Sequence, residues 1–265
     1  MLLGLAVALV GVAAGLAPAG AVVFRPIPTG TTGADISWPQ CTGTTMGGQP
    51  SGASFGIVGV NDGLAGTENP CLSAELAWAA TLSYHSPVKV YVNTADPGNG
   101  VADWPTTNPS GTKNPYGACK DVTRQGASVG ADSQACAWAY GYNKAVQDVG
   151  WVPSPSSDHW WLDVETDNSW QSGKRLDLNE AVLDGMLAEL PAHQVGVYST
   201  SYQWNEIVGS TLDSHSRALG ALAQWIPTGA SSASTSDCSS LTKFTTGSIE
   251  YVQYTTDYDY DIACT

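Results

Sequence analysis

Basic residues are scarce in this chain. Its 265 residues include 10 Lys and Arg against 24 Asp and Glu, and the formal net charge at pH 7 is −14. Nucleic-acid binding depends on clustered Lys and Arg that neutralise phosphates, so the composition argues against a nucleic-acid partner. The same charge provides no long-range attraction toward an anionic polymer, and recognition of such a polymer must therefore be local.

Long apolar runs are absent beyond the first 21 residues, so no later segment is expected to cross a bilayer. Residues 1–21 are apolar and end in Ala19-Gly20-Ala21, which matches the Ala-x-Ala signal-peptidase pattern, although no Lys or Arg precedes Arg25. We predict a secretion signal peptide over 1–21, with a retained membrane anchor as the alternative. The Pro-, Gly- and Thr-rich residues 22–32 are then an N-terminal arm. The mature protein is expected to be secreted or cell-wall associated, monomeric, and free of stable membrane association.

Several catalytic motifs are also missing. There is no Cys-x-x-Cys pair, no Gly-x-Ser-x-Gly elbow and no Ser-His-Asp order. Their absence argues against zinc or redox chemistry and against an esterase or protease. The histidines show no metal-ligand spacing, and they are His85, His159, His193 and His215. We therefore expect neither a metal nor a cofactor.

The cysteines are even in number and spread along the chain, at Cys41, Cys71, Cys119, Cys136, Cys238 and Cys264. This pattern is typical of an exported protein that is stabilised by disulfides. Six cysteines allow 15 pairings, and the sequence does not select among them. Our working expectation is sequential pairing, with bonds 41–71, 119–136 and 238–264.

One run of bulky apolar residues ends in two carboxylates, at His159-Trp160-Trp161-Leu162-Asp163-Val164-Glu165. Bulk followed by charge is typical of a buried strand as it leaves a core. Side chains alternate faces along a strand, so Asp163 and Glu165 should point to the same side, with Cα atoms roughly 6.5 Å apart. The alternative is an ordinary strand end whose polar residues meet solvent.

Two neighbouring carboxylates repel each other, so one tends to keep its proton near neutral pH while the other stays ionised. Cleavage of a sugar acetal uses this combination. An acid protonates the leaving oxygen, and an anion stabilises the developing positive charge or activates a nucleophile. The pair therefore predicts a glycan-cleaving site if further polar residues gather around it.

Strand and helix patterns alternate along the rest of the chain. Period-2 and buried apolar runs predict strands at 33–37, 55–60, 88–92, 159–165, 195–199, 221–226 and 249–254. Helical spacing predicts helices at 72–84, 132–149, 178–190 and 202–208, with Asp177 as a candidate N-cap. Such alternation implies parallel β/α units, and seven or eight strands in one domain favour a closed α/β barrel over residues 33–265.

Acidic residues recur where the predicted strands end. They are Asp35, Asp62, Asp163, Glu165 and a C-terminal cluster at Asp257-Tyr258-Asp259-Tyr260-Asp261. Catalytic residues of α/β barrels lie at strand ends, so these acids favour the glycan-cleaving interpretation. The Pro- and Gly-rich stretch 93–118 is predicted to be a lid or substrate wall, with plain disorder as the alternative.

Tryptophan is abundant, and indole rings stack well on sugar faces. We expect about half of Trp38, Trp104, Trp170 and Trp225 to line a cleft, because they lie in or beside predicted loops at strand ends. Trp78, Trp138 and Trp151 are instead expected in the core.

The order of these motifs resembles glycoside hydrolase family 25, the lysozymes that cut the β-1,4 bond between N-acetylmuramic acid and N-acetylglucosamine. The matching segments are Asp35-Ile36-Ser37-Trp38-Pro39-Gln40, Asp163-Val164-Glu165, Gly196-Val197-Tyr198-Ser199, Gln253-Tyr254-Thr255 and Asp261-Ile262. The resemblance extends from about Gly33 to Ala263. It implies a modified (β/α) TIM-like barrel, stabilised here by disulfides, that acts on peptidoglycan or a related amino-sugar glycan.

The resemblance also implies roles for individual residues. Glu165 would be the general acid/base, and Asp163 would orient the substrate's N-acetyl group or stabilise the cation that forms when this group attacks; the opposite assignment stays open. Asp35 and Asp261 would complete an acidic floor. The full set of expected substrate-binding residues is Asp35, Asp62, Tyr91, Tyr198, Trp225, Gln253 and Asp261.

Two segments depart from the family pattern. Where the family usually has Lys-Ala-Thr-Glu-Gly after the second strand, this chain has Gly59-Val60-Asn61-Asp62-Gly63, and where the third strand tends to end Tyr-His-Phe it has Tyr91-Val92-Asn93. Two alternatives stay open, the first of them because of these departures. One is a weak or inactive glycan-binding barrel, and the other is a chitinase-like glycosidase, although Trp161 replaces the middle Asp of the fuller acidic signature of that group.

Overall fold

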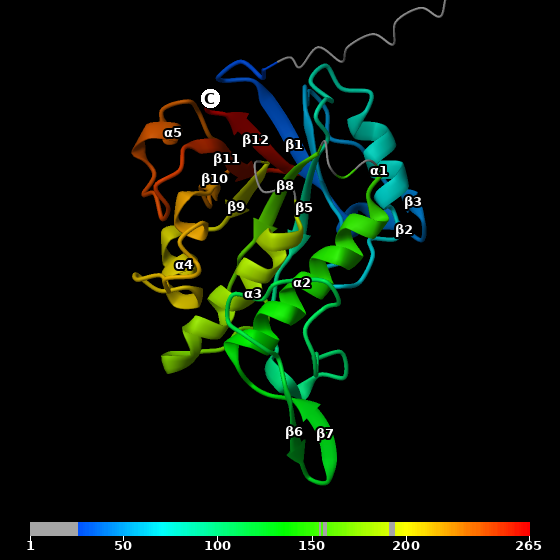
Figure 1. Cartoon of the computed structure of the whole chain (residues 1–265). Helices are drawn as coiled ribbons and strands as arrows, with labels where there is room; N and C mark the ends of the chain where they lie inside the picture. Colours follow the sequence, from blue (N-terminus) through cyan, green and yellow to red (C-terminus); the bar gives the residue numbers. More distant parts are fainter. Residues whose placement is uncertain (1–25, 154, 156–157, 191–193) are drawn as a thin grey trace, which may run out of the picture.

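The computed structural model describes residues 26–153, 155, 158–190 and 194–265. Within them, eight strands close into a barrel in the order β1-β12-β11-β10-β9-β8-β5-β4 (Figure 1). Their bounds are β1 (Thr32–Ile36), β4 (Gly56–Gly59), β5 (Lys89–Asn93), β8 (His159–Asp163), β9 (Val195–Tyr198), β10 (Ala223–Pro227), β11 (Ile249–Thr255) and β12 (Asp259–Ala263). The expected single-domain α/β barrel is confirmed. The predicted signal peptide lies outside the described residues.

One strand runs against the others. β1, β4, β5, β8, β9, β10 and β11 pair in parallel, whereas β12 is antiparallel to both β1 and β11. The prediction that residues 257–261 form an acidic cluster after the last strand was wrong. Asp259–Ala263 turns back into the barrel wall, where the alternation Asp-Tyr-Asp-Ile suits a strand with one face inward.

Aromatic rings fill the barrel interior. Phe55, Trp161, Trp225 and Tyr251 are all buried there, and the Trp161 and Trp225 rings meet edge to face with centroids 5.9 Å apart. The neighbouring strand makes room for this packing, because a Cβ at Gly196 would lie 2.3 Å from the Trp161 ring. Large side chains thus fill the centre of the barrel.

Helices cover the outside of the barrel (Figure 1). They are α1 (Leu72–Ala79), α2 (Gln134–Trp151), α3 (Leu176–Glu189), α4 (Ser201–Ile207) and the short α5 (Asp237–Ser240), with 3₁₀ turns at Trp38–Gln40, Gly98–Gly100, Gly173–Arg175 and Leu219–Ala221. Glycines let α2 and α3 pack closely, since a Cβ at Gly141 would lie 1.9 Å from the Val182 carbonyl oxygen and one at Gly185 would lie 2.0 Å from that of Trp138. Among the described residues, none of the helices has both the length and the apolar character needed to span a bilayer.

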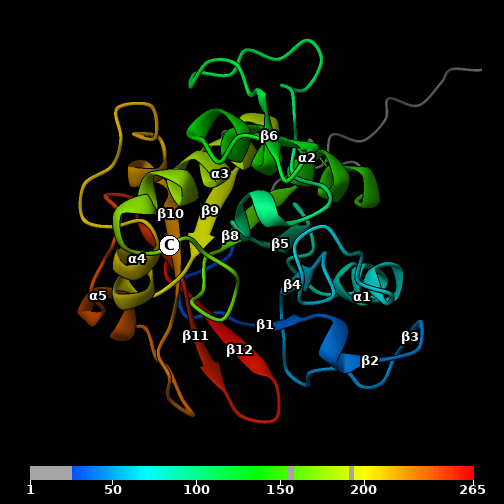
Figure 2. The same cartoon turned by 90° about the horizontal axis from the view of Figure 1, so that it is seen from below.

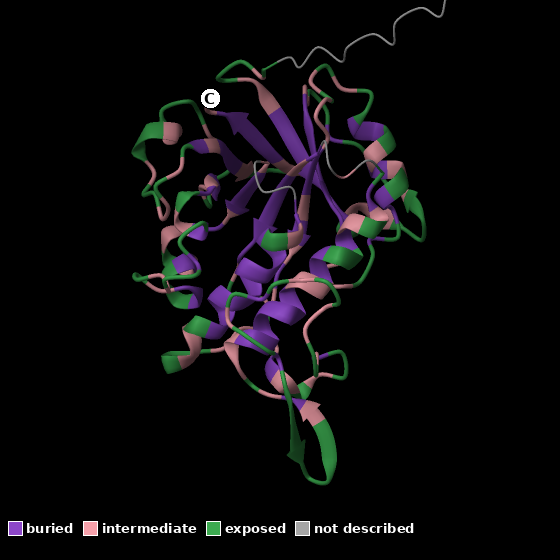
Figure 3. Ribbon diagram, viewed as in Figure 1, coloured by how far each residue is buried: buried purple, intermediate pink, exposed green. Residues whose placement is uncertain are grey.

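Two small hairpins lie outside the barrel, β2 (Cys41–Thr42) with β3 (Thr45–Met46), and β6 (Asp121–Arg124) with β7 (Ala127–Gly130). Neither hairpin was predicted from the sequence. The β6–β7 hairpin is the longer of the two. It projects from the lower end of the molecule in Figure 1 and is largely exposed in Figure 3, while the barrel strands are mostly buried.

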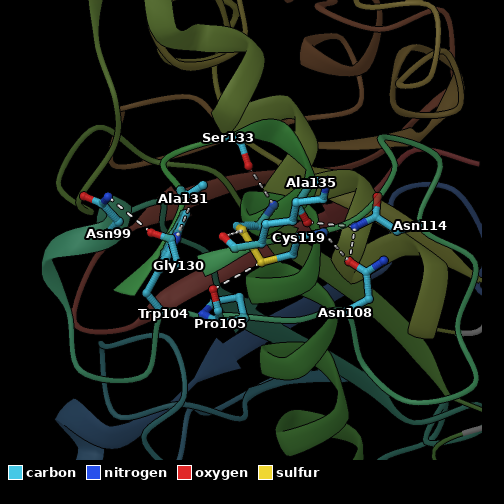
Figure 4. The surroundings of a disulfide bond; sticks show 12 residues. Asn99, Trp104, Pro105, Asn108, Asn114, Cys119, Gly130, Ala131, Ser133 and Ala135 are labelled. Atoms are coloured by element: carbon cyan, nitrogen blue, oxygen red, sulfur yellow. Dashed lines mark hydrogen bonds between the residues drawn. A yellow bond between two sulfur atoms is a disulfide. The ribbon is translucent and has the colours of Figure 1, made fainter. Parts of the chain in front are cut away.

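The three disulfides are Cys41–Cys71, Cys119–Cys136 and Cys238–Cys264, the sequential pairing expected from the sequence. Around the second bond, the stretch 93–118 is fixed rather than structureless (Figure 4). Asn114 donates to the Ala135 carbonyl oxygen at 2.7 Å, and Trp104 donates to that of Ala131 at 3.1 Å. These bonds hold the stretch against the start of α2.

Candidate active site

A cavity of about 260 Å³ opens at the end of the barrel where the parallel strands finish. Figure 2 looks toward this end. Its walls are acidic and aromatic, and the lining residues are Asp35, Tyr91, Asp163, Glu165, Tyr198, Trp225, Gln253, Thr255 and Asp259. Seven of the eight barrel strands, or the residues directly after them, supply these side chains, and active sites of α/β barrels are commonly built from several strands in this way.

Asp163 and Glu165 face the cavity together. Asp163 is the last residue of β8 and is 4% exposed, while Glu165 is half-buried beyond the strand end. Val164 lies between them with its side chain in the main core, and its backbone N–H extends the ladder to the Tyr198 carbonyl oxygen at 2.9 Å. This alternation brings the two carboxyl groups to one side, in the arrangement that the sequence predicted.

Both carboxyl groups hold protons more tightly than usual. Burial, followed by the charge of Glu165, raises the pKa of Asp163 well above its ordinary value. Burial also raises the pKa of Glu165, while Gln203, which donates to Glu165 Oε1 at 3.5 Å, opposes the increase. Because the two groups interact, the pair titrates as a unit and retains a proton at a pH where a free carboxyl would be ionised. An acid and an anion are thus available in one cavity.

Asp35 is held by a two-step hydrogen-bond relay. The Tyr198 hydroxyl donates to Gln253 Oε1 at 2.8 Å, and Gln253 Nε2 donates to Asp35 Oδ2 at 2.8 Å. Burial and the charge of Asp259 raise the pKa of Asp35 to about 8, against the lowering effect of the Gln253 bond. Asp35 is therefore predominantly protonated at neutral pH and can donate a hydrogen bond to a ligand oxygen.

Three aromatic side chains form one wall of the cavity. The Trp225 ring lies 4.5 Å from that of Tyr198 and 6.0 Å from that of Tyr91, measured between centroids. Burial raises the pKa of both tyrosines well above the ordinary value, so both phenols stay neutral. Such a wall offers apolar faces and hydroxyl groups together, which suits a sugar ring.

Two of the expected substrate-binding residues do not line the cavity. Asp62 lies in the turn after β4, where its backbone N–H bonds to the Thr67 carbonyl oxygen. Asp261 is fully buried in the barrel and accepts a hydrogen bond from Trp225 Nε1 at 2.7 Å. The other seven candidates, including the proposed catalytic pair, do line it.

Two further lining residues, Asp259 and Thr255, were not proposed from the sequence. Asp259 begins β12 at the cavity rim, and its charge raises the pKa of both Asp35 and Glu165. The acids at every second position, 257, 259 and 261, were the sequence feature that could have identified Asp259 as a site residue.

Only one of the four tryptophans expected near the cleft reaches this cavity. Trp225 lines it, whereas Trp104 is buried and stacks on Tyr140, with ring centroids 5.2 Å apart. Trp38 is exposed and Trp170 packs against the main core. None of the residues 94–130 lines the cavity, so the predicted lid does not form its immediate wall.

A larger cavity, of about 870 Å³, lies at the opposite end of the barrel, where β5, β8 and β11 begin. Its walls are mainly apolar, with Lys89, His159 and Glu250 among the polar lining residues. Among the described residues that line it, Glu250 is the only one with an acidic side chain, and no carboxyl pair of the kind on which the predicted chemistry depends is found among them. In the described part of the chain, the one cluster with metal-ligand spacing is Cys41, Cys71 and Glu75, whose cysteines are joined in a disulfide.

Comparison with known proteins places the fold. No protein-family model and no curated protein sequence matches the chain. Among solved structures, the muramidase from Trichobolus zukalii is similar over 88% of this chain and 93% of its own, at 15% identity and a TM-score of 0.52. A family 25 glycosyl hydrolase from Bacillus anthracis is similar over 89% and 90%, at 14% identity and a TM-score of 0.51.

The third similar structure is the modular Cpl-1 endolysin complexed with a peptidoglycan analogue. The similarity covers 89% of this chain and 55% of the endolysin, at 16% identity and a TM-score of 0.52. The carboxyl pair therefore lies at the end of a strand in a barrel whose fold is similar to that of the muramidase, the endolysin and the family 25 glycosyl hydrolase.

Proposed function

We propose that this protein is a glycoside hydrolase of the muramidase type, which cleaves β-1,4 bonds of peptidoglycan. The observation that carries the proposal is the Asp163–Glu165 pair, whose pKa values are both raised, in an acidic and aromatic cavity at the carboxyl end of the barrel. Similar folds in muramidases, and in an endolysin complexed with a peptidoglycan analogue, support this choice of substrate.

Glu165 is the proposed general acid. It is half-buried at the rim, where a glycosidic oxygen can approach it, while Asp163 lies deeper and is 4% exposed. Protonation of the leaving oxygen by Glu165 would leave a positive charge on the sugar. Asp163 would stabilise that charge, or the cation formed when the substrate's own N-acetyl group attacks. Protonated Asp35 would donate a hydrogen bond to a sugar oxygen, and the Tyr198 oxygen, whose hydrogen is donated to Gln253, would accept one from a sugar hydroxyl.

We also propose that the protein acts outside the membrane, as a secreted or cell-wall-associated monomer. Three disulfides support export, because such bonds persist mainly in oxidising compartments. Peptidoglycan is found in the same location.

A barrel that binds glycan without cutting it is the second candidate, and the unusual Asn61-Asp62 and Asn93 segments favour it. Incubation of purified peptidoglycan with the mature protein and with Glu165→Gln separates the two functions. Muramidase activity predicts release of soluble fragments by the wild type only, with both proteins still binding the sediment. Binding by both proteins without fragments from either would contradict the proposal and leave the binding barrel. Chitin serves as a parallel substrate, and cleavage of chitin alone would favour a chitinase-like enzyme.

A further inference from the structure

A chain of hydrogen bonds connects Asp163 to the outer helix α2. Asn93, at the end of β5, donates through Nδ2 to Asp163 Oδ2 at 2.8 Å. The backbone N–H of Asn93 donates to Asn61 Oδ1 at 2.8 Å. Asn61 in turn donates through Nδ2 to Oδ1 of Asp148, on α2, at 2.9 Å. Three elements that are distant in sequence thus converge on one carboxyl group of the proposed catalytic pair.

The orientation of the Asn61 amide is set by its partners. A backbone N–H can only donate, so the oxygen of Asn61 must face Asn93 and its nitrogen must face the other way. An acceptor is then required on that side, because Asn61 is only 1% exposed and an unpaired buried amide is costly. Asp148, also 1% exposed, provides it. Asp148 therefore holds Asn61, and Asn61 holds the end of β5 that carries Asn93.

Asn93 has a distinct effect on Asp163. Among the described residues, it is the only one whose side-chain nitrogen donates to this carboxyl group, and the other oxygen, Oδ1, is buried without a hydrogen-bond partner. A hydrogen bond to a carboxylate is stronger than one to a neutral carboxyl group. The Asn93 amide thus favours the ionised form of Asp163 against burial, which favours the neutral form.

We propose that Asn93, held by Asn61 and Asp148, is a positioning residue that favours the ionised form of Asp163 and so shifts the shared proton of the pair toward Glu165. The importance of this proton for catalysis rests on the proposed muramidase function. The hydrogen-bond chain itself does not, because it consists of contacts within the protein.

None of the charged groups described around Asp163 stabilises its ionised form, whereas the Asn93 amide does. The other titratable groups that interact with Asp163 are Glu165 and Asp35, which oppose its ionisation, and the neutral phenols of Tyr91 and Tyr198. No cation among the described residues forms a salt bridge with Asp163. A hydrogen-bond donor is therefore the means by which this site can stabilise a buried anion.

At the far end of the chain, Asp148 has its own balance of interactions. Burial raises the pKa of Asp148 to about 7, while the Asn61 bond and the charge of Lys144 lower it. The neutral phenol of Tyr140 also interacts with it. Either protonation state of Asp148 retains an oxygen that accepts from Asn61, so the orientation of Asn61 does not depend on that titration.

The hydrogen-bond chain also gives a role to the departures from the family pattern. Asn61 lies in the segment that replaces Lys-Ala-Thr-Glu-Gly, and Asn93 lies in the segment that replaces Tyr-His-Phe. Both departures form part of one connection to Asp163. The residues that replace the family pattern in this chain thus support Asp163. Their presence argues against the view that the two changed segments only remove catalytic residues.

The test is an NMR titration of the Asp163 side-chain carboxyl carbon, which needs no substrate. Replacing Asn93 by Leu (Asn93→Leu) should raise the apparent pKa of Asp163 by about one unit or more. Asn61→Leu, which does not touch Asp163, should raise it in the same direction by less. Asp148→Asn keeps the acceptor and should leave it close to the wild-type value. If Asn93→Leu does not fold, Asn93→Ser replaces it, because the shorter side chain cannot reach Asp163.

Asn179→Leu is the matched control. Asn179 is fully buried and donates to the Ile207 and Gln171 carbonyl oxygens, without contact to the pair, so its loss should destabilise the fold and leave the Asp163 pKa unchanged. A folded Asn93 variant in which Asp163 titrates as in the wild type would overturn the proposal. A raised pKa in a protein that cuts no glycan would keep the proposal and reject the function. Glycan cleavage that depends on Glu165, together with an Asp163 pKa that is unchanged in Asn93→Leu, would support the function and reject the proposal.

Discussion

Gln253 Nε2 lies 2.8 Å from Asp35 Oδ2, although the two residues are 218 positions apart in the sequence. The contact joins β11 to β1 across the barrel wall, beside the antiparallel strand β12. Gln253 can make it because the Tyr198 hydroxyl occupies its oxygen and thereby directs its nitrogen toward Asp35. The site is thus assembled from both ends of the chain and depends on closure of the barrel.

Gln253→Leu removes this connection. It leaves the Tyr198 hydroxyl and Asp35 without their partner, and the loss should cost about 1–3 kcal/mol of unfolding free energy. The pKa of Asp35 should also rise above its value of about 8, because the Gln253 bond lowers it. Denaturant titration and carboxyl NMR measure the two effects. Gln147→Leu, at an exposed position of α2, should alter neither, and equal stability of the two variants would contradict the relay.

Stability should fall as the pH rises from about 4 to about 8. Burial raises the pKa of Asp35 to about 8, of Glu75 and Asp148 to about 7, and of Asp96 and Asp184 to about 6. Across this range the folded protein binds more protons at these groups than the unfolded chain, so raising the pH favours unfolding.

Two groups oppose this trend in part of the range, Lys89, whose pKa burial lowers to about 8 so that it acts only near the upper limit, and His159. Burial lowers the pKa of His159 to about 4, so between about 4 and 6.5 it makes the protein more stable as the pH rises. The decline should therefore be clearest between about 6.5 and 8. Chemical denaturation at pH 6.5 and pH 8 checks it, and greater stability at pH 8 would show that these carboxyl groups are not held as described.

Glu165→Gln and Asp163→Asn should each lower the rate of glycan cleavage by about 10²- to 10⁴-fold, the usual contribution of a positioned acid or base. Binding to insoluble peptidoglycan should persist, because the amides keep the shape of the site. Glu206→Gln, an exposed acid on α4, is the control and should keep wild-type activity. A comparable loss of activity in Glu206→Gln, or no loss in the Glu165 and Asp163 variants, would contradict the catalytic roles proposed for Glu165 and Asp163.

The disulfides should differ in their effect on the site. The bonds Cys238–Cys264 and Cys119–Cys136 close loops with separations of 26 and 17 residues, so replacing either pair by Ala should cost about 3 kcal/mol of stability. Cys264 directly follows β12, which carries Asp259 at the cavity rim. Loss of that bond should therefore also reduce activity in the folded protein at low temperature, whereas loss of the 119–136 bond should not. Activity assays at matched folded fractions test the difference.

The carboxyl pair could be predicted from the sequence because its placement depends on local rules. Asp163 and Glu165 follow an apolar strand with period-2 spacing, and β8 has that geometry. Asp259 and Asp261 are also two positions apart, so their side chains point to the same face of the strand. Which of them lies closer to the cavity depends on the direction in which the strand runs. In a parallel strand Asp261 would lie nearer the rim. Because β12 is antiparallel, Asp259 is at the cavity and Asp261 is buried beneath Trp225.

The roles of Asn61 and Asn93 could not be predicted for a different reason. Each depends on a partner supplied by another element, Asp148 on α2 for Asn61 and Asp163 on β8 for Asn93. Nothing in the local pattern of either asparagine distinguishes it from a turn residue. Asp62, the acid next to Asn61, was the more conspicuous candidate, yet it does not line the cavity.

The most direct measurement is mass spectrometry of the sugar at each newly formed reducing end, after purified peptidoglycan has been treated with the mature protein and with Glu165→Gln. A muramidase predicts fragments that end in reducing N-acetylmuramic acid, present with the wild type and absent with the variant. Fragments that end in reducing N-acetylglucosamine, or an absence of fragments despite binding, would contradict the proposed function.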